Sequence, residues 1–178
     1  RLIVDVSAAA AQAAMDTGVA ARPIKDMAAY KEKLHQFFYR TDLVMRPVFN
    51  RAKANPQRIV YCEGEEEKVL RASQVTVDDG NAFPILIGRK SVVETRIKRL
   101  NLRLQAGKDF EIVDPEDDPR YKDYWTTYHQ IMERRGVTPS DARRVVRTNT
   151  TVIGALMVYK GEADAVICGT EGQYSNHL

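Results

Sequence analysis

The feature that most constrains this chain is the alternation of strand-like and helix-like segments that begins after residue 57. Short apolar runs are each followed by stretches with apolar residues at helical spacing. The predicted strands are Arg58–Tyr61, Phe83–Gly88, Phe110–Val113 and a buried Ala165–Cys168. The predicted helices are Glu66–Asp79, Ser91–Leu100, Arg120–Arg135, one that starts at Thr138, and Asn149–Lys160. Strands separated by helices predict an α/β fold, a three-layer lobe whose mostly parallel sheet is covered on both faces.

The residues before this alternation read as helices. Leu2–Asp16 is rich in alanine, and Asp26 can cap a second helix. A third helix is expected over Leu43–Ala54, with a kink or restart at Pro47. Asn55-Pro56-Gln57 is polar, contains proline and marks the change of pattern, so we expect a boundary there. The predicted domains are residues 1–54 and 55–178.

Charge and cysteine content exclude several classes of protein. The net charge is +3 with both signs mixed along the chain, which is unlike the clustered basic face of a nucleic-acid-binding protein. No apolar run is long enough for a membrane span. Cys62 and Cys168 form no C-x-x-C pair, which favours a cytoplasmic protein with two reduced, buried thiols. Because the first residue is Arg1 rather than methionine, we expect a piece of a larger protein.

The turn after the first predicted strand is acidic and carries no phosphate-binding motif. It reads Cys62-Glu63-Gly64-Glu65-Glu66-Glu67, where a dinucleotide fold would need G-x-G-x-x-G. These glutamates would repel phosphate, and they suit the positive end of the next helix. P-loop, zinc and G-x-S-x-G patterns are absent too. The segment is therefore not expected to bind NADP, and the sequence offers no metal or catalytic residues in these patterns.

An aromatic stripe marks the predicted helix Arg120–Arg135. It consists of Tyr121, Tyr124, Trp125, Tyr128 and Met132. Such a stripe is more often core or subunit interface than a base-stacking surface. Arg135 points toward the same stripe and needs a carboxylate, the helix carbonyls or a ligand phosphate as its partner.

Arg143, Arg144 and Arg147 precede the polar run Thr148–Thr151 and the last predicted helix. Guanidinium groups beside a helix start can hold an anion. The favoured interpretation is a solvated basic face with Asn149 or a threonine as N-cap.

The loop after the last predicted strand contains the candidate ligand-binding residues. Loops at the carboxyl ends of parallel strands are where open α/β sheets bind ligands, and Gly169 and Gly172 allow close backbone approach. The polar candidates are Thr170, Gln173, Ser175, Asn176 and His177, with Arg135 as a further contributor. An ordinary connecting loop accounts for the pattern equally well.

Two stretches resemble known families. Ala13–Ile24 resembles the end of the NAD(P)-binding domain of malic enzymes, and Arg58–Leu178 resembles the N-terminal part of the phosphate acetyl/butyryl transferase family. The second resemblance rests on Glu63–Ala72, Pro84–Arg89, Asp114–Tyr121, Arg134–Pro139, Arg147–Thr151 and Gly161–Ala165. Because both parts occur in this order, the chain resembles the bacterial hybrid-type NADP-dependent malic enzymes.

This resemblance implies a parent enzyme that oxidatively decarboxylates malate to pyruvate and CO2, using NADP and a divalent metal (Mg or Mn). It also implies that the segment is regulatory, forms homo-oligomers and supplies half of a cleft that senses acetyl-CoA or a related acyl-phosphate. The transferases have a Ser/Thr-rich loop followed by arginine where this chain has Gly169–His177. The alternatives are a lobe of an active phosphate acetyltransferase and a dimerisation module that binds no ligand.

Overall fold

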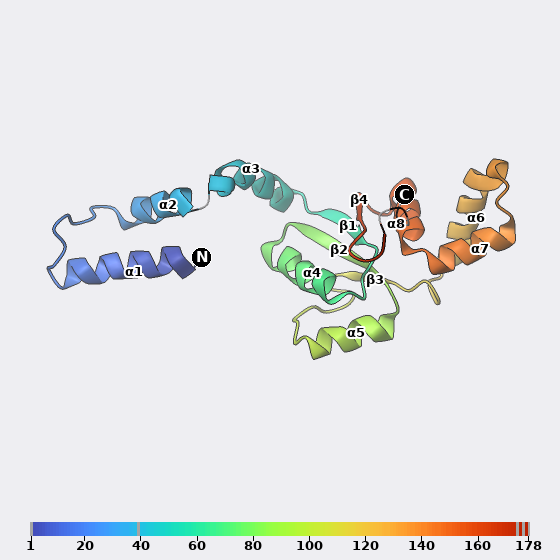
Figure 1. Ribbon diagram of the computed structural model, residues 1–178, viewed down its shortest axis with the longest axis horizontal. Coiled ribbons are helices and arrows are strands. Elements are labelled where there is room, and N and C mark those ends of the chain that lie inside the picture. The colour runs from blue at the N-terminus through green and yellow to red at the C-terminus, as the bar shows by residue number, and fades with distance from the viewer. Residues whose placement is uncertain (1, 39, 174, 176, 178) are drawn as a thin grey trace. The chain divides into compact units, whose positions relative to one another are not determined.

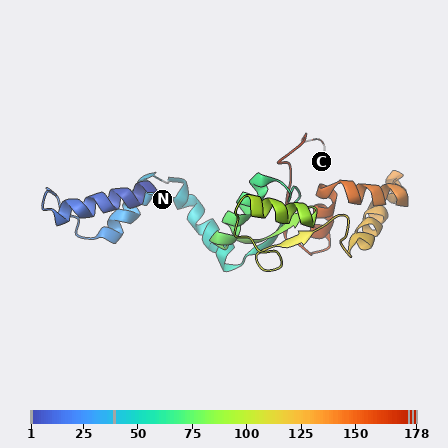
Figure 2. The ribbon, with the colours of Figure 1, turned by 90° about the horizontal axis from the view of Figure 1, so that it is seen from below.

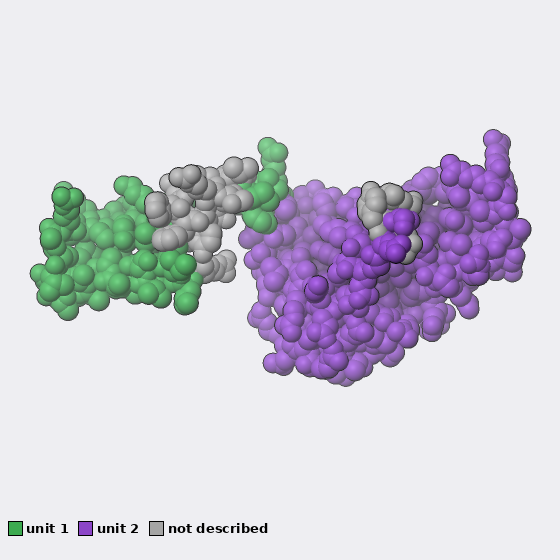
Figure 3. Space-filling model, in the orientation of Figure 1, with its two compact units in different colours: residues 1–51 green, residues 52–178 purple. Residues whose placement is uncertain are grey.

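The computed structural model describes residues 2–38, 40–173, 175 and 177, without the side chains of residues 35–44. The chain divides into two compact units, residues 1–51 and 52–178 (Figure 3). In the described residues, no helix combines the length and the apolar character that crossing a bilayer requires.

The first unit is helical. Its helices are α1 (Leu2–Asp16), α2 (Met27–Phe38) and most of α3 (Arg40–Ala54). The predicted cap is confirmed, because the Asp26 carboxylate accepts hydrogen bonds from the backbone N–H groups of Ala28 and Ala29 at 2.9 and 3.0 Å. The predicted restart at Pro47 is wrong, because α3 continues through this proline as one helix.

The second unit is built on one parallel sheet. Its strands are β1 (Gln57–Tyr61), β2 (Ala82–Ile87), β3 (Glu111–Val113) and β4 (Ala165–Ile167), in the order β3-β2-β1-β4 (Figure 1). At the centre, Tyr61 of β1 lies beside Leu86 of β2 and Ile167 of β4. The predicted parallel α/β sheet is confirmed.

Helices cover both faces of this sheet. They are α4 (Glu67–Asp79), α5 (Lys90–Arg99), α6 (Tyr121–Met132), the 3-10 turn η1 (Glu133–Arg135), α7 (Pro139–Thr148) and α8 (Thr150–Tyr159). Successive residues of β2 serve opposite faces, because strand side chains alternate. Leu86 packs with α4 and α5, while Ile85 and Ile87 pack with α6 and α8. In Figure 2, α5 lies in front of the strands.

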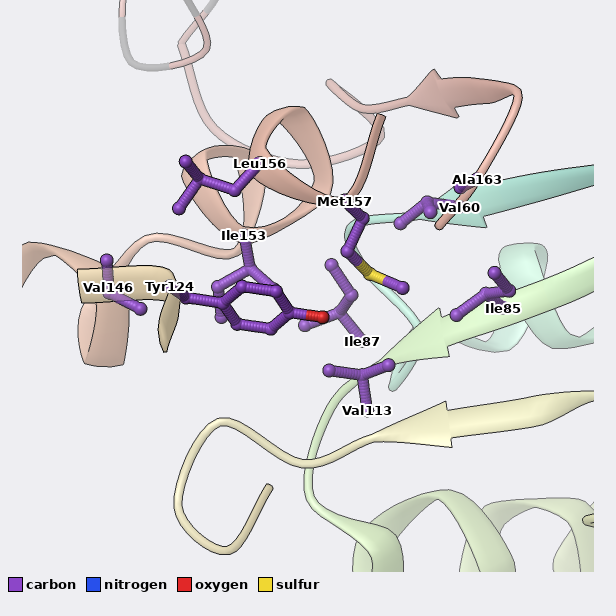
Figure 4. Close-up of a cluster of buried hydrophobic side chains, with 10 residues drawn as sticks. All are labelled: Val60, Ile85, Ile87, Val113, Tyr124, Val146, Ile153, Leu156, Met157 and Ala163. Atoms are coloured by element: carbon purple, nitrogen blue, oxygen red, sulfur yellow. The ribbon is translucent and has the colours of Figure 1, made fainter. Parts of the chain in front are cut away.

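The aromatic stripe of α6 is part of the core, as predicted. Tyr124 is buried, and from α6 it points with Met157 of α8 toward Ile87 and Val113 of the sheet (Figure 4). The other aromatic residues that pack against this cluster are partly buried: Tyr121, Trp125 and Tyr128.

The predicted burial of the last strand is wrong. In β4, Ala165 and Ile167 are exposed, and only Val166 packs against the core. The reason is that β4 is an edge strand of the described sheet, covered by α8 on one face. Cys168 is accordingly half-buried, so the expectation of two buried thiols holds for Cys62 alone.

Candidate functional site

A cavity of about 380 Å³ lies at the carboxyl edge of the sheet. Parallel strands all end on this side, so the turns after β1, β2 and β3 converge there. Its lining comprises Cys62, Glu63, Glu65, Glu66, Ile87, Gly88, Arg89, Pro115, Glu116, Arg147, Thr150 and Glu171. The cavity therefore occupies the position where open α/β sheets bind ligands.

The turn after β1 approaches β2 so closely that it requires glycine. A Cβ atom added to Gly64 would lie 2.8 Å from the backbone oxygen and 2.9 Å from the backbone nitrogen of Ile87. The Gly64 N–H donates to the same Ile87 oxygen at 3.0 Å. Backbone atoms cannot yield as a flexible side chain can, so this turn forms one wall of the cavity only with glycine at this position.

The glutamates of this turn have arginine partners around α5. The Glu65 carboxylate accepts two side-chain bonds from Arg89, at 2.9 and 2.8 Å, and one from the Arg89 backbone N–H. Two further pairs are Glu66 with Arg96 and Glu67 with Arg99. The hydrogen bond from the Arg89 guanidinium is the main cause that lowers the pKa of Glu65. Arg89 lines the cavity, yet its charge is already matched by Glu65.

The loop after β4 is attached to the lobe at both of its described ends. The Gly169 N–H donates to a Glu63 carboxylate oxygen at 2.7 Å. His177 Nε2 lies 2.8 Å from the Glu171 carbonyl oxygen, which only accepts, so Nε2 carries a proton. In the neutral ring, Nδ1 then accepts from the Thr151 hydroxyl at 3.0 Å. His177 is thus held between α8 and its own loop.

The predicted site residues are only partly brought together. His177 turns inward, whereas Thr170, Gln173 and Ser175 are exposed. Asn176 lies outside the described residues. Arg135 is exposed in η1 and does not line the cavity.

The sequence interpretation missed Glu63 and Thr151, which hold this loop. A signal for Glu63 was its place directly after the same strand edge, where the sequence interpretation assigned it to repelling phosphate and to the positive end of the next helix. The signal for Thr151 was its position in the first turn of α8, beside the expected cap. Asn149 is that cap, because its side-chain oxygen accepts from the N–H groups of Thr151 and Val152 at 3.0 and 3.2 Å. The start of α8 thus has part of its donors satisfied internally.

The basic residues of α7 stack on the aromatic face of α6. The Arg143 guanidinium lies 4.4 Å from the Trp125 ring centroid, and that of Arg147 lies 4.7 Å from the Tyr121 ring centroid. Arg147 also lines the cavity. Stacking leaves the edge of a guanidinium able to donate, so Arg147 can contact an anion there.

Cys62 is a buried thiol in the lining of the cavity. Burial raises the pKa of Cys62 to about 12, and the neighbouring Cys168 and Glu63 add to the effect. The thiolate is the nucleophilic form, so only a small fraction of Cys62 is nucleophilic near neutral pH. Among the described residues, no cluster of His, Cys, Asp and Glu could hold a metal ion.

The lining of the cavity is predominantly acidic. Its carboxylates are Glu63, Glu65, Glu66, Glu116 and Glu171, against the guanidinium groups of Arg89 and Arg147. With Arg89 engaged by Glu65, Arg147 is the cation best placed for an incoming phosphate. On its own, this wall fits the uncharged or acyl end of a ligand better than a phosphate.

Comparisons with known proteins agree with this architecture. A family model described as phosphate acetyl/butaryl transferase matches residues 43–178. The chain is 55% identical over its whole length to the NADP-dependent malic enzyme of Salmonella typhimurium and 56% identical to that of Escherichia coli. It spans 24% of each of these relatives. A phosphate acetyltransferase of Nitratidesulfovibrio vulgaris is 34% identical over 68% of this chain and 17% of its own length.

Solved structures show the same fold. The EutD phosphotransacetylase from Staphylococcus aureus superposes with a TM-score of 0.63 at 23% identity, covering 72% of this chain and 39% of that one. A phosphotransacetylase from Streptococcus pyogenes gives a TM-score of 0.64 over 75% of this chain and 40% of its own. The match over 43–178 and the whole-chain identity lead to one conclusion: the chain belongs to the phosphate acetyl/butaryl transferase family, in the form that malic enzymes contain.

Proposed function

We propose that this chain is a regulatory and assembly segment of an NADP-dependent malic enzyme and forms half of a cleft that senses acetyl-CoA. The parent would convert malate to pyruvate and CO2 with NADP and a divalent metal, bound elsewhere in the enzyme. The main support is the whole-chain identity to malic enzymes, together with a cavity at the carboxyl edge of a transferase-like sheet.

The acidic cavity argues for sensing rather than transfer. Phosphoryl and acyl-phosphate groups are bound by cations and backbone donors that face them. Here Glu65 neutralises Arg89, and Asn149 occupies donors at the start of α8. The phosphates of acetyl-CoA would meet Arg147 on this lobe, and the remaining cations would come from an opposing lobe.

The test measures malate oxidation by the intact malic enzyme that contains this segment, with and without acetyl-CoA. Ser175→Ala combined with Asn176→Ala should reduce the response to acetyl-CoA several-fold and leave turnover without effector unchanged. Lys122→Ala, an exposed change on α6, is the matched control and should retain the full response. Full acetyl-CoA sensitivity in the double variant would remove this loop from the site.

A second assay separates the alternative function. Acetyl-phosphate formation from acetyl-CoA and phosphate should stay at background in the intact enzyme. Turnover that saturates with both substrates would instead identify an active phosphate acetyltransferase.

We also propose that the segment contributes to a homo-oligomer. Tyr159 on α8 and Ile167 on β4 leave 71% and 46% of their surfaces exposed, and a partner subunit could cover this apolar surface. Tyr159→Lys with Ile167→Lys should lower the oligomeric state of the intact enzyme in light scattering. An unchanged mass would exclude this surface from the interface.

A further inference from the structure

Cys62 and Cys168 occupy equivalent positions on neighbouring parallel strands. Tyr61 pairs with Ile167, and the next residue along, Cys62, donates its backbone N–H to the Ile167 oxygen at 3.0 Å. Cys62 and Cys168 are therefore the next pair in register, each directly after the last residue of its strand. Adjacent strands lie about 4.8 Å apart, within the range of Cα separations that a disulfide bridges.

Both thiols also face the same side of the sheet. Residues two apart on a strand point to the same face of the sheet, so Cys62 shares a face with Val60 and Cys168 shares a face with Val166. A Cβ atom placed on Gly154 of α8 would lie 2.9 Å from the Cys62 sulfur and 2.7 Å from a methyl group of Val166. The face that both side chains share is therefore the one that α8 covers.

The two cysteines differ in accessibility. Cys62 is fully buried, whereas Cys168 is half-buried at the end of an edge strand. Gly169 follows with φ of +94°, a conformation that glycine adopts without strain, so the regular strand conformation ends beside Cys168. An oxidant in solution reaches Cys168 first.

We propose that Cys62 and Cys168 form a reversible intramolecular disulfide, with Cys168 as the thiol that reacts first and Cys62 as the thiol that resolves it. The reaction partner is a low-molecular-weight disulfide. The Cys168 thiolate attacks one of its sulfurs, forms a mixed disulfide and releases one thiol. The Cys62 thiolate then attacks the Cys168 sulfur and releases the second thiol. The protein dithiol loses two electrons, the small disulfide gains them, and both protons end on the released thiols.

The bridge would fix the base of the loop that carries Glu171 over the cavity. In the reduced protein, the contacts of Gly169 with Glu63 and of His177 with Thr151 hold this loop. The disulfide adds a covalent tie between β1 and β4 at the same point. The inference holds whichever ligand the cavity binds.

The test treats the reduced chain with oxidised glutathione at low protein concentration and analyses it by mass spectrometry and peptide mapping. The expected product is a single chain that is lighter by two hydrogen atoms and carries no glutathione. Its peptide map should contain the Cys62 and Cys168 peptides joined by a disulfide that dithiothreitol reduces. A chain that keeps glutathione on Cys168, retains both alkylatable thiols or links only to a second chain would overturn the proposal.

Two matched variants assign the order of the steps. Cys62→Ala should stop at a stable glutathione adduct on Cys168, while Cys168→Ala should leave Cys62 unmodified. Adduct formation on Cys62 in the second variant would reverse the proposed roles. The peptide map of the unsubstituted chain tests for the disulfide directly. The proposal can therefore still be refuted if one of the cysteine variants does not fold.

The second step should become faster as the pH rises. Because the thiolate of Cys62 is the attacking species and burial raises its pKa, closure should be faster at pH 9 than at pH 7. A closure rate that falls between pH 7 and pH 9 would contradict attack by the Cys62 thiolate.

Discussion

Gly154 lies where α8 packs closely against the sheet. An added Cβ would lie 2.7 Å from Val166, 2.9 Å from the Cys62 sulfur and 3.3 Å from Val60. The absence of a side chain lets the helix settle onto the carboxyl halves of β1 and β4. The close packing of α8 on the sheet therefore depends on the lack of a side chain at Gly154.

Gly154→Ala should lower the free energy of unfolding by about 1–3 kcal/mol, the usual cost of overpacking a core. Helix propensity alone would favour alanine over glycine by about 1 kcal/mol. A decrease in the free energy of unfolding would therefore show that overpacking outweighs helix propensity. Urea denaturation measures the difference. Ala155→Leu, on the exposed side of α8, is the control and should change stability little. A more stable Gly154→Ala variant would show that the sheet can yield.

The sequence predicts single residues well where the cause is local. Asp26, Thr138 and Asn149 are caps because the side chain and the amides it binds are neighbours in the chain. Residues whose partners are remote were missed, as Glu63 was. Its bond to Gly169 joins positions 106 residues apart, and only the completed sheet brings them together.

At the scale of elements, α4 and α5 are linked by ion pairs as well as by their apolar contacts with the sheet. Glu65, Glu66 and Glu67 meet Arg89, Arg96 and Arg99 respectively. The sequence predicted the extents of both helices but not this pairing, because helical spacing shows which side faces the core and not which charges lie opposite. A similar limit explains why β4 was predicted as buried. An apolar strand sequence does not distinguish a central strand from an edge strand.

The Glu65–Arg89 pair should make stability fall in acid. The pKa of Glu65 is lowered in the folded chain, so its contribution is fully present above the ordinary value of 4.5 and is lost as the pH falls through the lower folded value. Glu65→Gln should therefore lose stability at pH 7 and flatten the decline below pH 4.5. Because Arg89 leaves 56% of its side chain exposed, solvent screening keeps the effect small.

Thermal unfolding from pH 7 to pH 3 measures this effect. Glu133→Gln, an exposed carboxylate in η1, serves as the control and should follow the unmodified chain. Parallel pH curves for Glu65→Gln and the unmodified chain would contradict the role given to this pair.

At the scale of the whole molecule, the chain divides into two compact units at a point within α3. The structural division falls between Arg51 and Ala52, a little before the boundary expected from the sequence at residues 55–57. The predicted boundary relied on Pro56 and on the change of pattern, which mark where β1 begins rather than where helical contacts end. The expected domain limits remain a prediction.

Limited trypsin treatment should cut first after Arg51 or Lys53. Both residues are exposed and lie where the two units meet in sequence, so opening this helix end disrupts few contacts. The expected product is a resistant piece that contains the sheet, identified by its N-terminal sequence. First cleavage after Arg147 or Lys160, at the ends of α7 and α8, would show that the weak point lies elsewhere.

The edge position of β4 has a consequence for solubility. In the described sheet, β4 pairs with β1 on one side, and its other row of backbone groups has no strand beside it. Such a row is a template on which a foreign strand can add. At three residues the template is short, which limits the hazard, but Ile167 beside it is apolar and exposed. The segment should therefore self-associate through this edge in concentrated solution. Ile167→Lys should raise the protein concentration at which turbidity appears.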